Sequence, residues 1–325
     1  MIQTAPLVGE QAASYLEGRL NFDLQTLLTF PKYFLLETFC GCNANCIMCG
    51  IDFSKKKRRP MDDALFERII TEIGLYRDHV EKVMLYLDGE PLLDAKLAER
   101  IRLTKAQGIK IANIATNASL LDADRAEELI KAGLDEVYIT VESLNKDIYE
   151  SIRRGLKFET VMKNVLGFIT LRDRLNPALR VRVQMIQQAA NQDEPEAFTA
   201  FWKSKLSDID QIAIQKAHNW ASKVKGRNEA EDPFINNVPC IALWGTFVVH
   251  VDGTAPLCCM DTDTRVPLGN VAEESIRDIW TGQRLEAIRQ KHTSGTRADI
   301  PLCDGCTLWR EVKRDLPQTP SPAKG

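Results

Sequence analysis

The chain has 325 residues, a formal net charge of −3 and 44% hydrophobic residues. This length can bury a substantial core as one large domain, or as one large and one small domain. The slightly acidic balance argues against nucleic-acid binding, and no apolar run reaches the roughly 18–20 residues that cross a bilayer. The N-terminus lacks the pattern of a signal peptide, so we expect a cytoplasmic protein with no membrane partner.

From residue 33 onward, short apolar stretches alternate with amphipathic helical patterns. The predicted strands are Tyr33–Thr38, Lys82–Leu87, Lys110–Ala115, Glu136–Val141, Arg180–Ile186 and Gln211–Ala217. The predicted helices are Asp62–Tyr76, Ala95–Gln107, Asp122–Ala132, Phe158–Arg174 and Glu194–Ser204. Six strand–helix units in a row predict an α/β fold with a parallel sheet, either doubly wound or curled into a partial (β/α)6 barrel.

Polar residues gather where the predicted strands end. A cysteine-rich loop follows the first strand, and the later strands end at Asp88-Gly89-Glu90-Pro91, Thr116-Asn117, Glu142-Ser143, Gln184 and Gln215-Lys216. In a parallel barrel these ends meet at one mouth, where they would line a single pocket. The pattern therefore favours the TIM-like partial barrel.

The pattern changes after residue 217. Two apolar segments, Gly245–Val251 and Thr254–Cys258, flank Asp252-Gly253 and predict a β-hairpin, which two short helices follow, around Ser275–Trp280 and Arg284–His292. We predict an N-terminal extension (1–30), the barrel (31–217), a linker (218–239), a small α+β domain (240–312) and a disordered tail (313–325).

The nine cysteines occur mostly in clusters. In a large chain without an export signal, clustered cysteines favour metal binding over disulfides. Cys42, Cys46 and Cys49 have the spacing C-x3-C-x2-C, which can hold three corners of a 4Fe–4S cluster and leave the fourth iron open to a substrate or cofactor. A zinc site with a fourth ligand elsewhere is the alternative.

This spacing and the strand-end motifs resemble the radical S-adenosylmethionine (radical SAM) family over about residues 33–217. The resemblance implies that the three cysteines bind a 4Fe–4S cluster, that Met48 lies near the adenine, and that the reduced cluster splits SAM into methionine and a 5′-deoxyadenosyl radical. It also implies SAM contacts from Gly89, Glu90, Thr116, Asn117, Glu142, Ser143 and Gln184. A carboxylate such as Glu90 suits the methionine ammonium group. Asp88 and Ala118 depart from the family pattern, since many members have glycine at both positions.

Cys240, Cys258, Cys303 and Cys306 offer four more thiolates. Their order resembles the twitch module, a reduced SPASM domain, which implies an auxiliary 4Fe–4S cluster; a zinc knuckle is the alternative. Cys40 and Cys259 remain. We expect Cys40 to be a buried small side chain. Cys259 either replaces Cys258 as a ligand, packs in the core, or gives a hydrogen atom to the substrate radical, as a cysteine does in radical SAM epimerases.

The chain is similar to the cyclitol and aminosugar dehydrogenase and epimerase group. This implies hydrogen abstraction from a carbinol carbon of a small polar substrate, followed by dehydrogenation or epimerisation. Modification of a ribosomally made peptide is an alternative, although about 30 residues before the barrel are few for a leader-binding domain. A non-catalytic iron–sulfur electron carrier is a third hypothesis, against which the open iron argues.

Two further groups of residues bear on partners. Candidate substrate contacts are Glu142, Arg153, Arg154, Arg182, Gln215, Lys216, His218 and Trp220. The basic run at residues 55–59 is either a solvated loop or a landing site for an acidic electron donor of the flavodoxin or ferredoxin type.

Overall fold

The computed structural model describes residues 6–221, 223 and 236–306. The predicted tail (313–325) and most of the predicted linker (218–239) lie outside these ranges, so both remain predictions. Within the described ranges, none of the helices has the length and apolarity needed to span a membrane.

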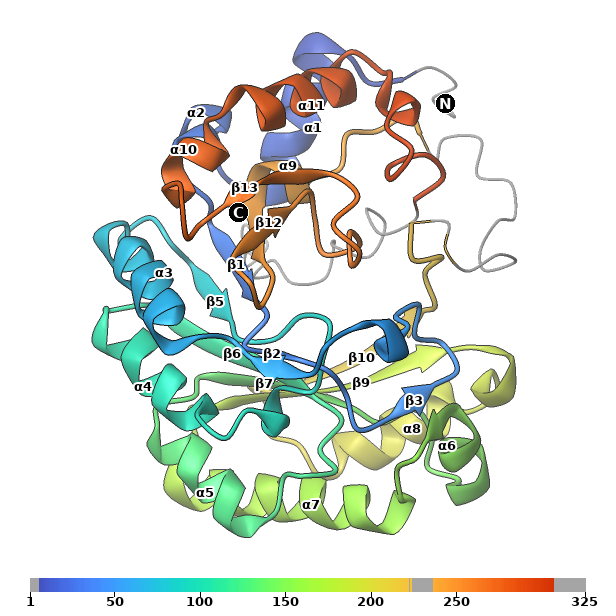
Figure 1. Cartoon of the computed structure of the whole chain (residues 1–325). Coiled ribbons are helices and arrows are strands. Elements are labelled where there is room, and N and C mark those ends of the chain that lie inside the picture. The colour runs from blue at the N-terminus through green and yellow to red at the C-terminus, as the bar shows by residue number, and fades with distance from the viewer. Residues whose placement is uncertain (1–5, 222, 224–235, 307–325) are drawn as a thin grey trace, which may run out of the picture.

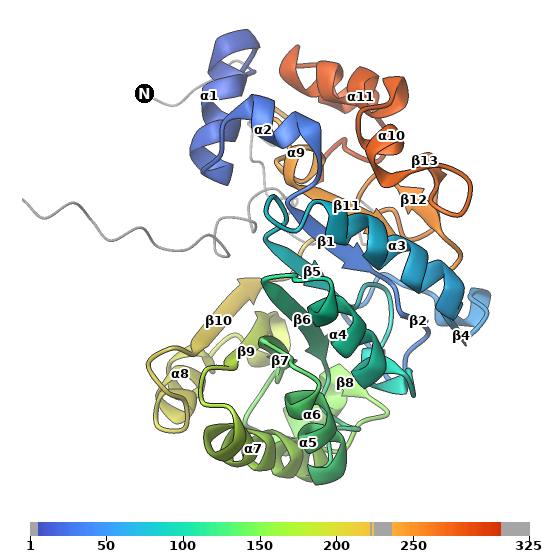
Figure 2. The same cartoon turned by 90° about the vertical axis from the view of Figure 1, so that its left-hand side faces the viewer.

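Seven parallel strands form the central sheet, in the spatial order β10-β9-β7-β6-β5-β1-β11 (Figures 1 and 2). Their bounds are β1 Tyr33–Leu36, β5 Lys82–Met84, β6 Ile111–Thr116, β7 Glu136–Thr140, β9 Arg180–Gln187, β10 Gln211–Lys216 and β11 Thr246–Val249. The first six strands follow one another across the sheet in chain order, without the reversal of a doubly wound sheet. The sheet is therefore singly wound, which confirms the partial (β/α)6 barrel.

Helices cover the outside of this sheet (Figure 1). They are α3 Asp63–Leu75, α4 Leu97–Ala106, α5 Ala123–Lys131, α6 Lys146–Ile152, α7 Phe158–Leu175 and α8 Pro195–Lys203. The side chains of Asp62 and Asp122 cap α3 and α5 by accepting hydrogen bonds from backbone N–H groups three residues later. The sequence pattern does not indicate α6, because seven residues are too few to show a helical period.

The two faces of the sheet differ in polarity. Val83, Ile114, Val137 and Val183 are at most 1% exposed and alternate along their strands with polar residues. On the polar face, the Lys82 ammonium lies 2.6 Å from Glu136, and the Arg182 guanidinium lies over the Tyr138 ring. The apolar face packs against helices, as successive side chains of a strand point to opposite faces, and the polar face lines the inside of the barrel.

The predicted C-terminal hairpin differs in its pairing. The chain does turn at Asp252-Gly253, where Gly253 has φ +86° and the His250 N–H donates to the Thr254 carbonyl at 2.9 Å. However, β11 pairs in parallel with β1, whereas β12 (Thr254–Pro256) pairs antiparallel with β13 (Pro267–Asn270). The last three of the four β11 residues are buried, which suits a strand covered on both faces at the barrel edge.

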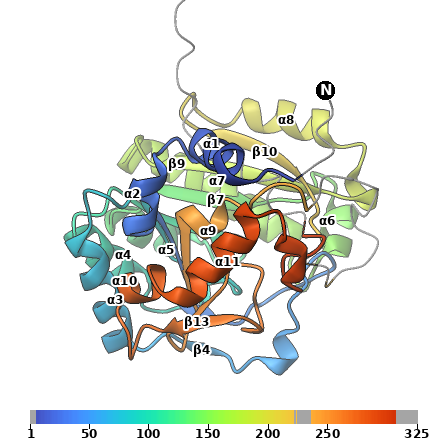
Figure 3. The same ribbon diagram turned by 90° about the horizontal axis from the view of Figure 1, so that it is seen from above.

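The N-terminal residues pack on the C-terminal domain, although the two are far apart in the sequence. Helices α1 (Gly9–Leu20) and α2 (Leu24–Thr29) lie beside α9 (Ala242–Gly245), α10 (Ile276–Trp280) and α11 (Gln283–Thr293) (Figure 3). The Trp280 indole N–H donates to the Leu27 carbonyl at 3.0 Å, and Leu27 is fully buried. The predicted N-terminal extension is thus part of the core that supports the small domain.

Candidate functional site

The cysteine loop at residues 41–50 is fastened to the end of β5. The Glu90 N–H donates to the Gly41 carbonyl at 2.9 Å. A Cβ atom on Gly89 would lie 2.5 Å from the Phe39 carbonyl oxygen and 2.6 Å from that of Gly41. Because both neighbours are backbone atoms, only glycine fits at position 89, and the predicted motif holds the loop in place.

The thiols of this loop need a cation to become ligands. Burial raises the pKa of Cys42 to about 11, although the Ala44 N–H and the Arg153 charge oppose the shift. Burial also raises the pKa of Cys49, against the same Arg153 charge. At neutral pH these groups are therefore thiols until a metal displaces their protons.

Glu90 joins the ends of β5 and β6. Its carboxylate is 2% exposed and accepts hydrogen bonds from the Leu92 N–H (3.1 Å), the Thr116 hydroxyl (2.6 Å) and the Asn117 N–H (2.9 Å). Burial raises the pKa of this carboxyl, and the three donors partly offset the shift. Glu90 thus orients the Thr116-Asn117 segment. The contact of the Glu90 carboxylate with the SAM ammonium group stays a prediction.

The Thr116-Asn117 segment also touches the cysteine loop. The Asn117 amide donates to the Asn43 side-chain oxygen at 2.9 Å, and the Asn43 amide donates to the Ser119 hydroxyl at 2.8 Å. Ala118 has φ +58°, a left-handed conformation that glycine adopts without strain. Ala118 therefore adopts a backbone conformation in which glycine, the common residue of the family at this position, would be less strained.

Glu142 and Ser143, which follow β7, are paired within the protein. Glu142 is fully buried, and its carboxylate accepts from the Ile186 N–H (2.6 Å) and from the Arg153 guanidinium. Ser143 donates to Glu194 at 2.7 Å. Their predicted SAM contacts remain untested. By contrast, the Gln184 side chain on β9 has no hydrogen-bond partner among the described residues and keeps its amide open to a ligand.

The remaining candidate contacts are divided between the barrel and the segment after β10. Arg154 is exposed next to Arg153. Arg182 lies on β9, and Gln215 and Lys216 lie on the edge strand β10. The Trp220 indole N–H donates to the Met48 carbonyl at 2.8 Å, and its ring lies 4.7 Å from that of His218. The segment at 218–221 therefore covers the cysteine loop.

The basic run is not a uniform surface patch. The Lys56 side chain is 17% exposed, and its ammonium lies 2.6 Å from the buried Asp88 carboxylate. Arg59 lies 3.7 Å from Asp252 of the C-terminal domain. The run therefore bridges the cysteine loop to the barrel and to the small domain, and the docking of an electron donor on it remains a prediction.

A buried charge cluster joins the barrel to the C-terminal domain. The ligand atoms of Glu37, Asp88 and His250 lie within 4.8 Å of one another. The His250 ring nitrogens face two acceptors, the Glu37 carboxylate (3.4 Å) and the Asp261 carbonyl (3.2 Å). A neutral imidazole can donate to only one of these acceptors, so the pair favours the charged form. Together with Lys56 it balances the two carboxylates.

This cluster predicts a pH-dependent stability. Burial lowers the pKa of His250, but Glu37 and Asp88 outweigh it and raise the pKa above about 6.5. The stabilising contribution is complete below pH 6.5 and is lost as the pH rises through the raised pKa. His250→Gln should cost about 2 kcal/mol at pH 6 and much less at pH 9. Thermal unfolding of both proteins across this range checks it, and an equal loss at both pH values would contradict it.

The cysteines of the C-terminal domain lie close enough together to interact electrostatically. Burial raises the pKa of Cys258 far above its usual range, and the charges of Cys259, Cys240, Cys306 and Cys303 add to the shift. Burial likewise raises the pKa of Cys259 to about 12, but here Asp88 of the barrel contributes beside Cys240 and Cys306. Cys258 and Cys259 therefore both interact with Cys240 and Cys306, and which of the two is the cluster ligand stays a prediction.

Two buried basic residues, absent from the sequence predictions, organise these cysteines. The Arg297 guanidinium, 1% exposed, donates to the carbonyls of Val238 (3.0 Å), Cys303 (2.9 Å) and Cys306 (3.3 Å). The His292 Nδ1 accepts the Cys240 N–H at 3.1 Å, while burial and the Arg297 charge lower the His292 pKa to about 3. No sequence signal separates these two residues from exposed basic ones.

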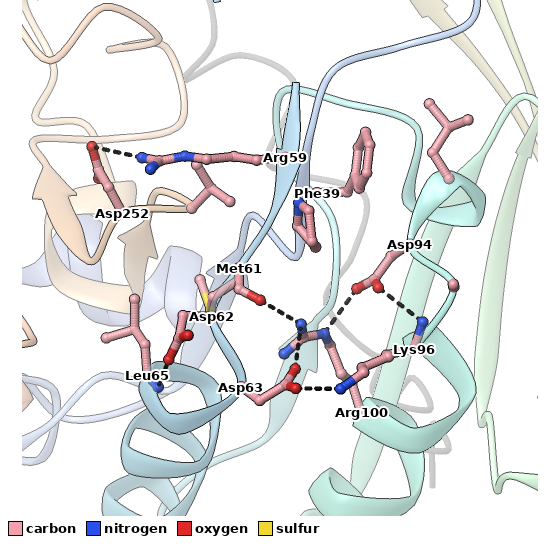
Figure 4. Close-up of a pocket in the computed structure, with 14 residues that line it drawn as sticks. Phe39, Arg59, Met61, Asp62, Asp63, Leu65, Asp94, Lys96, Arg100 and Asp252 are labelled. Carbon is pink, nitrogen blue, oxygen red and sulfur yellow. Dashed lines mark hydrogen bonds and ion pairs between the residues drawn. The ribbon is translucent and has the colours of Figure 1, made fainter. Parts of the chain in front are cut away.

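A cavity of about 780 Å³ lies beside the site, between β4 (Arg59–Pro60), the start of α3 and the start of α4 (Figure 4). Its charged residues are already paired. Arg100 donates to Asp94 (2.8 Å) and to the Met61 carbonyl (2.6 Å), and Lys96 pairs with Asp63. None of the residues predicted to bind SAM or the clusters lines this cavity.

Two segments of the chain match models of known families. Residues 36–168 match the radical SAM superfamily, and residues 240–307 match the iron–sulfur cluster-binding SPASM domain. The chain is 29% identical over 170 residues to a GTP 3′,8-cyclase of Chlorobaculum tepidum and spans about half the length of that protein (48%). It is 24% identical over 277 residues to the S-adenosyl-L-methionine-dependent 2-deoxy-scyllo-inosamine dehydrogenase of Niallia circulans, covering 83% of this chain and 90% of that protein.

Solved structures share the fold. BtrN in complex with AdoMet and 2-DOIA superposes with a TM-score of 0.61 at 19% identity, over 86% of this chain and 93% of that one. Streptococcus suis SuiB bound to the precursor peptide SuiA superposes with a TM-score of 0.64 at 15% identity, over 88% and 74%. Together with the two matched domains, these folds imply SAM and two iron–sulfur clusters as cofactors.

The two matched domains favour iron–sulfur clusters over single zinc ions at both cysteine sites. Cys42, Cys46 and Cys49 would hold one cluster, and Cys240, Cys258, Cys303 and Cys306 the other.

Proposed function

We propose that this chain, which belongs to the radical SAM enzymes and carries a C-terminal SPASM domain, oxidises a carbinol carbon of a small polar substrate such as a sugar, aminosugar or cyclitol. The observation that carries the proposal is the match to the 2-deoxy-scyllo-inosamine dehydrogenase, because it covers 83% of this chain and 90% of that protein. The bound cluster and SAM would supply a 5′-deoxyadenosyl radical, which removes the hydrogen atom from the carbinol carbon.

The chain supplies a proton acceptor for the next step. Converting the carbinol radical to a carbonyl requires that its hydroxyl proton reach a base and that one electron reach an acceptor. Burial raises the pKa of Asp88, which makes this carboxylate a better base, while the Lys56 charge opposes the shift. The four cysteines of the SPASM domain would hold the electron acceptor.

Epimerisation is the second candidate, and Cys259 favours it. Burial raises the pKa of this thiol to about 12, so it keeps its hydrogen at neutral pH, and the Asp88 charge of the barrel adds to the shift. A thiol in that state can return a hydrogen atom to a carbon radical. Peptide modification rests only on the fold shared with SuiB, so we treat it as an outcome of the test.

The experiment is an anaerobic incubation of the reconstituted enzyme with dithionite and SAM in deuterated water, using 2-deoxy-scyllo-inosamine and simple aminosugars as probes. We expect 5′-deoxyadenosine, methionine and a new carbonyl without solvent deuterium on carbon, and Cys259→Ala should retain this activity. Deuterium at an inverted carbon that disappears in Cys259→Ala would establish epimerisation instead. Cleavage of SAM without conversion of any of these probes would point to a peptide substrate. Absence of both 5′-deoxyadenosine and methionine would leave only the electron-carrier hypothesis.

A further inference from the structure

Arg153 lies directly opposite a cysteine of the first cluster. The short strand β8 (Arg153–Arg154) pairs antiparallel with β3 (Asn45–Cys46), and Arg153 is the register partner of Cys46. The next residue of the loop extends the pairing, since the Ile47 N–H donates to the Ile152 carbonyl at 3.0 Å. This backbone pairing fixes the guanidinium beside the sulfur, with Arg153 Nη1 3.4 Å from Cys46 Sγ.

Glu142 holds the guanidinium in this orientation. The Arg153 Nη2 pairs with one Glu142 oxygen, and the other oxygen accepts the Ile186 N–H at 2.6 Å. The Glu142 side chain is fully buried and that of Arg153 is 11% exposed, so water screens the arrangement only weakly. The carboxylate and the sulfur contact different nitrogens of the guanidinium. An N–H group therefore points at Cys46 while Glu142 balances the charge.

We propose that Arg153 sets the reduction potential of the cluster held by Cys42, Cys46 and Cys49, through a charge-assisted N–H···S hydrogen bond to Cys46. Hydrogen bonds to ligand sulfurs are among the factors that tune such potentials. Reduction adds negative charge to the cluster, and a positive donor at the sulfur stabilises the reduced form. Arg153 therefore raises the potential and makes the cluster easier to reduce by a weak physiological donor.

The test measures the potential rather than the activity. Wild-type protein, Arg153→Gln and Arg153→Lys are reconstituted anaerobically and titrated with dithionite without SAM, and the reduced cluster is followed by electron paramagnetic resonance. We expect Arg153→Gln to shift the one-electron equilibrium about tenfold against reduction, which corresponds to about 59 mV. Arg153→Lys keeps the charge but loses the planar donor, so its potential should lie between the two.

The neighbouring Arg154 provides the matched control. It lies on the same strand with an exposed side chain, so Arg154→Gln should leave the potential unchanged. If Arg153→Gln binds its cluster fully and the cluster has the wild-type potential, the proposal is wrong, even if turnover falls. The arginine would then affect only the binding of a substrate or of SAM. If Arg153→Gln fails to load, Arg153→Lys decides: a wild-type potential in that variant also overturns it.

Discussion

Arg297→Gln should lose the auxiliary cluster and keep the cluster at residues 42–49. The guanidinium donates to three carbonyls, two of which are buried and belong to Cys303 and Cys306. Its charge also lowers the pKa of Cys240 and Cys303, against the larger effect of burial, and so favours the thiolates that bind metal. A glutamine side chain cannot donate to all three carbonyls and carries no charge. We therefore expect a loss of about 3 kcal/mol in the stability of the small domain.

Iron and sulfide analysis after anaerobic reconstitution measures the effect. Arg297→Gln should bind about four iron atoms per chain instead of about eight, because only one 4Fe–4S site remains. Cleavage of SAM to 5′-deoxyadenosine should continue, since the barrel is unchanged. Arg284→Gln, an exposed substitution on α11, is the matched control and should keep the full iron content. Full iron loading in Arg297→Gln would show that the cysteines are ordered without it.

Local patterns in the sequence predict the barrel well. The six predicted strands and five predicted helices occur within three residues of their expected bounds, because each is set by features close in the chain. Asp122, for example, caps α5, and the apolar run from Glu136 makes β7. The spacing of Cys42, Cys46 and Cys49 is also local information. It points to a cluster before any fold is known.

Features that depend on distant contacts could not be predicted in this way. The apolar stretch of β11 is compatible with a hairpin, and only the open edge of β1 selects the parallel pairing. The Glu142 carboxylate accepts hydrogen bonds from Arg153 and Ile186, which are 11 and 44 positions away, and no local pattern indicates these partners. Arg297 acts on residues up to 59 positions away, and no local pattern distinguishes it.

Glu90→Gln should disturb both the fold at the barrel mouth and the binding of SAM. One carboxylate oxygen accepts from the Leu92 N–H and the Thr116 hydroxyl, and the other accepts from the Asn117 N–H. In either orientation, the glutamine NH2 faces a backbone N–H and leaves that donor buried without an acceptor. We expect a loss of about 1–3 kcal/mol in the free energy of unfolding, because an orphaned buried donor costs its desolvation energy.

The same substitution should weaken SAM binding at least about tenfold, which corresponds to about 1.4 kcal/mol. The displaced Thr116-Asn117 segment contacts the cysteine loop through Asn43, so both sides of the predicted SAM site would shift. Calorimetric titration of SAM into the reconstituted protein, together with chemical unfolding, separates the two effects. Glu99→Gln, an exposed substitution on α4, should change neither quantity. A destabilised Glu90→Gln protein that binds SAM normally would restrict Glu90 to holding the loops together, and the ammonium group of SAM would then need another acceptor.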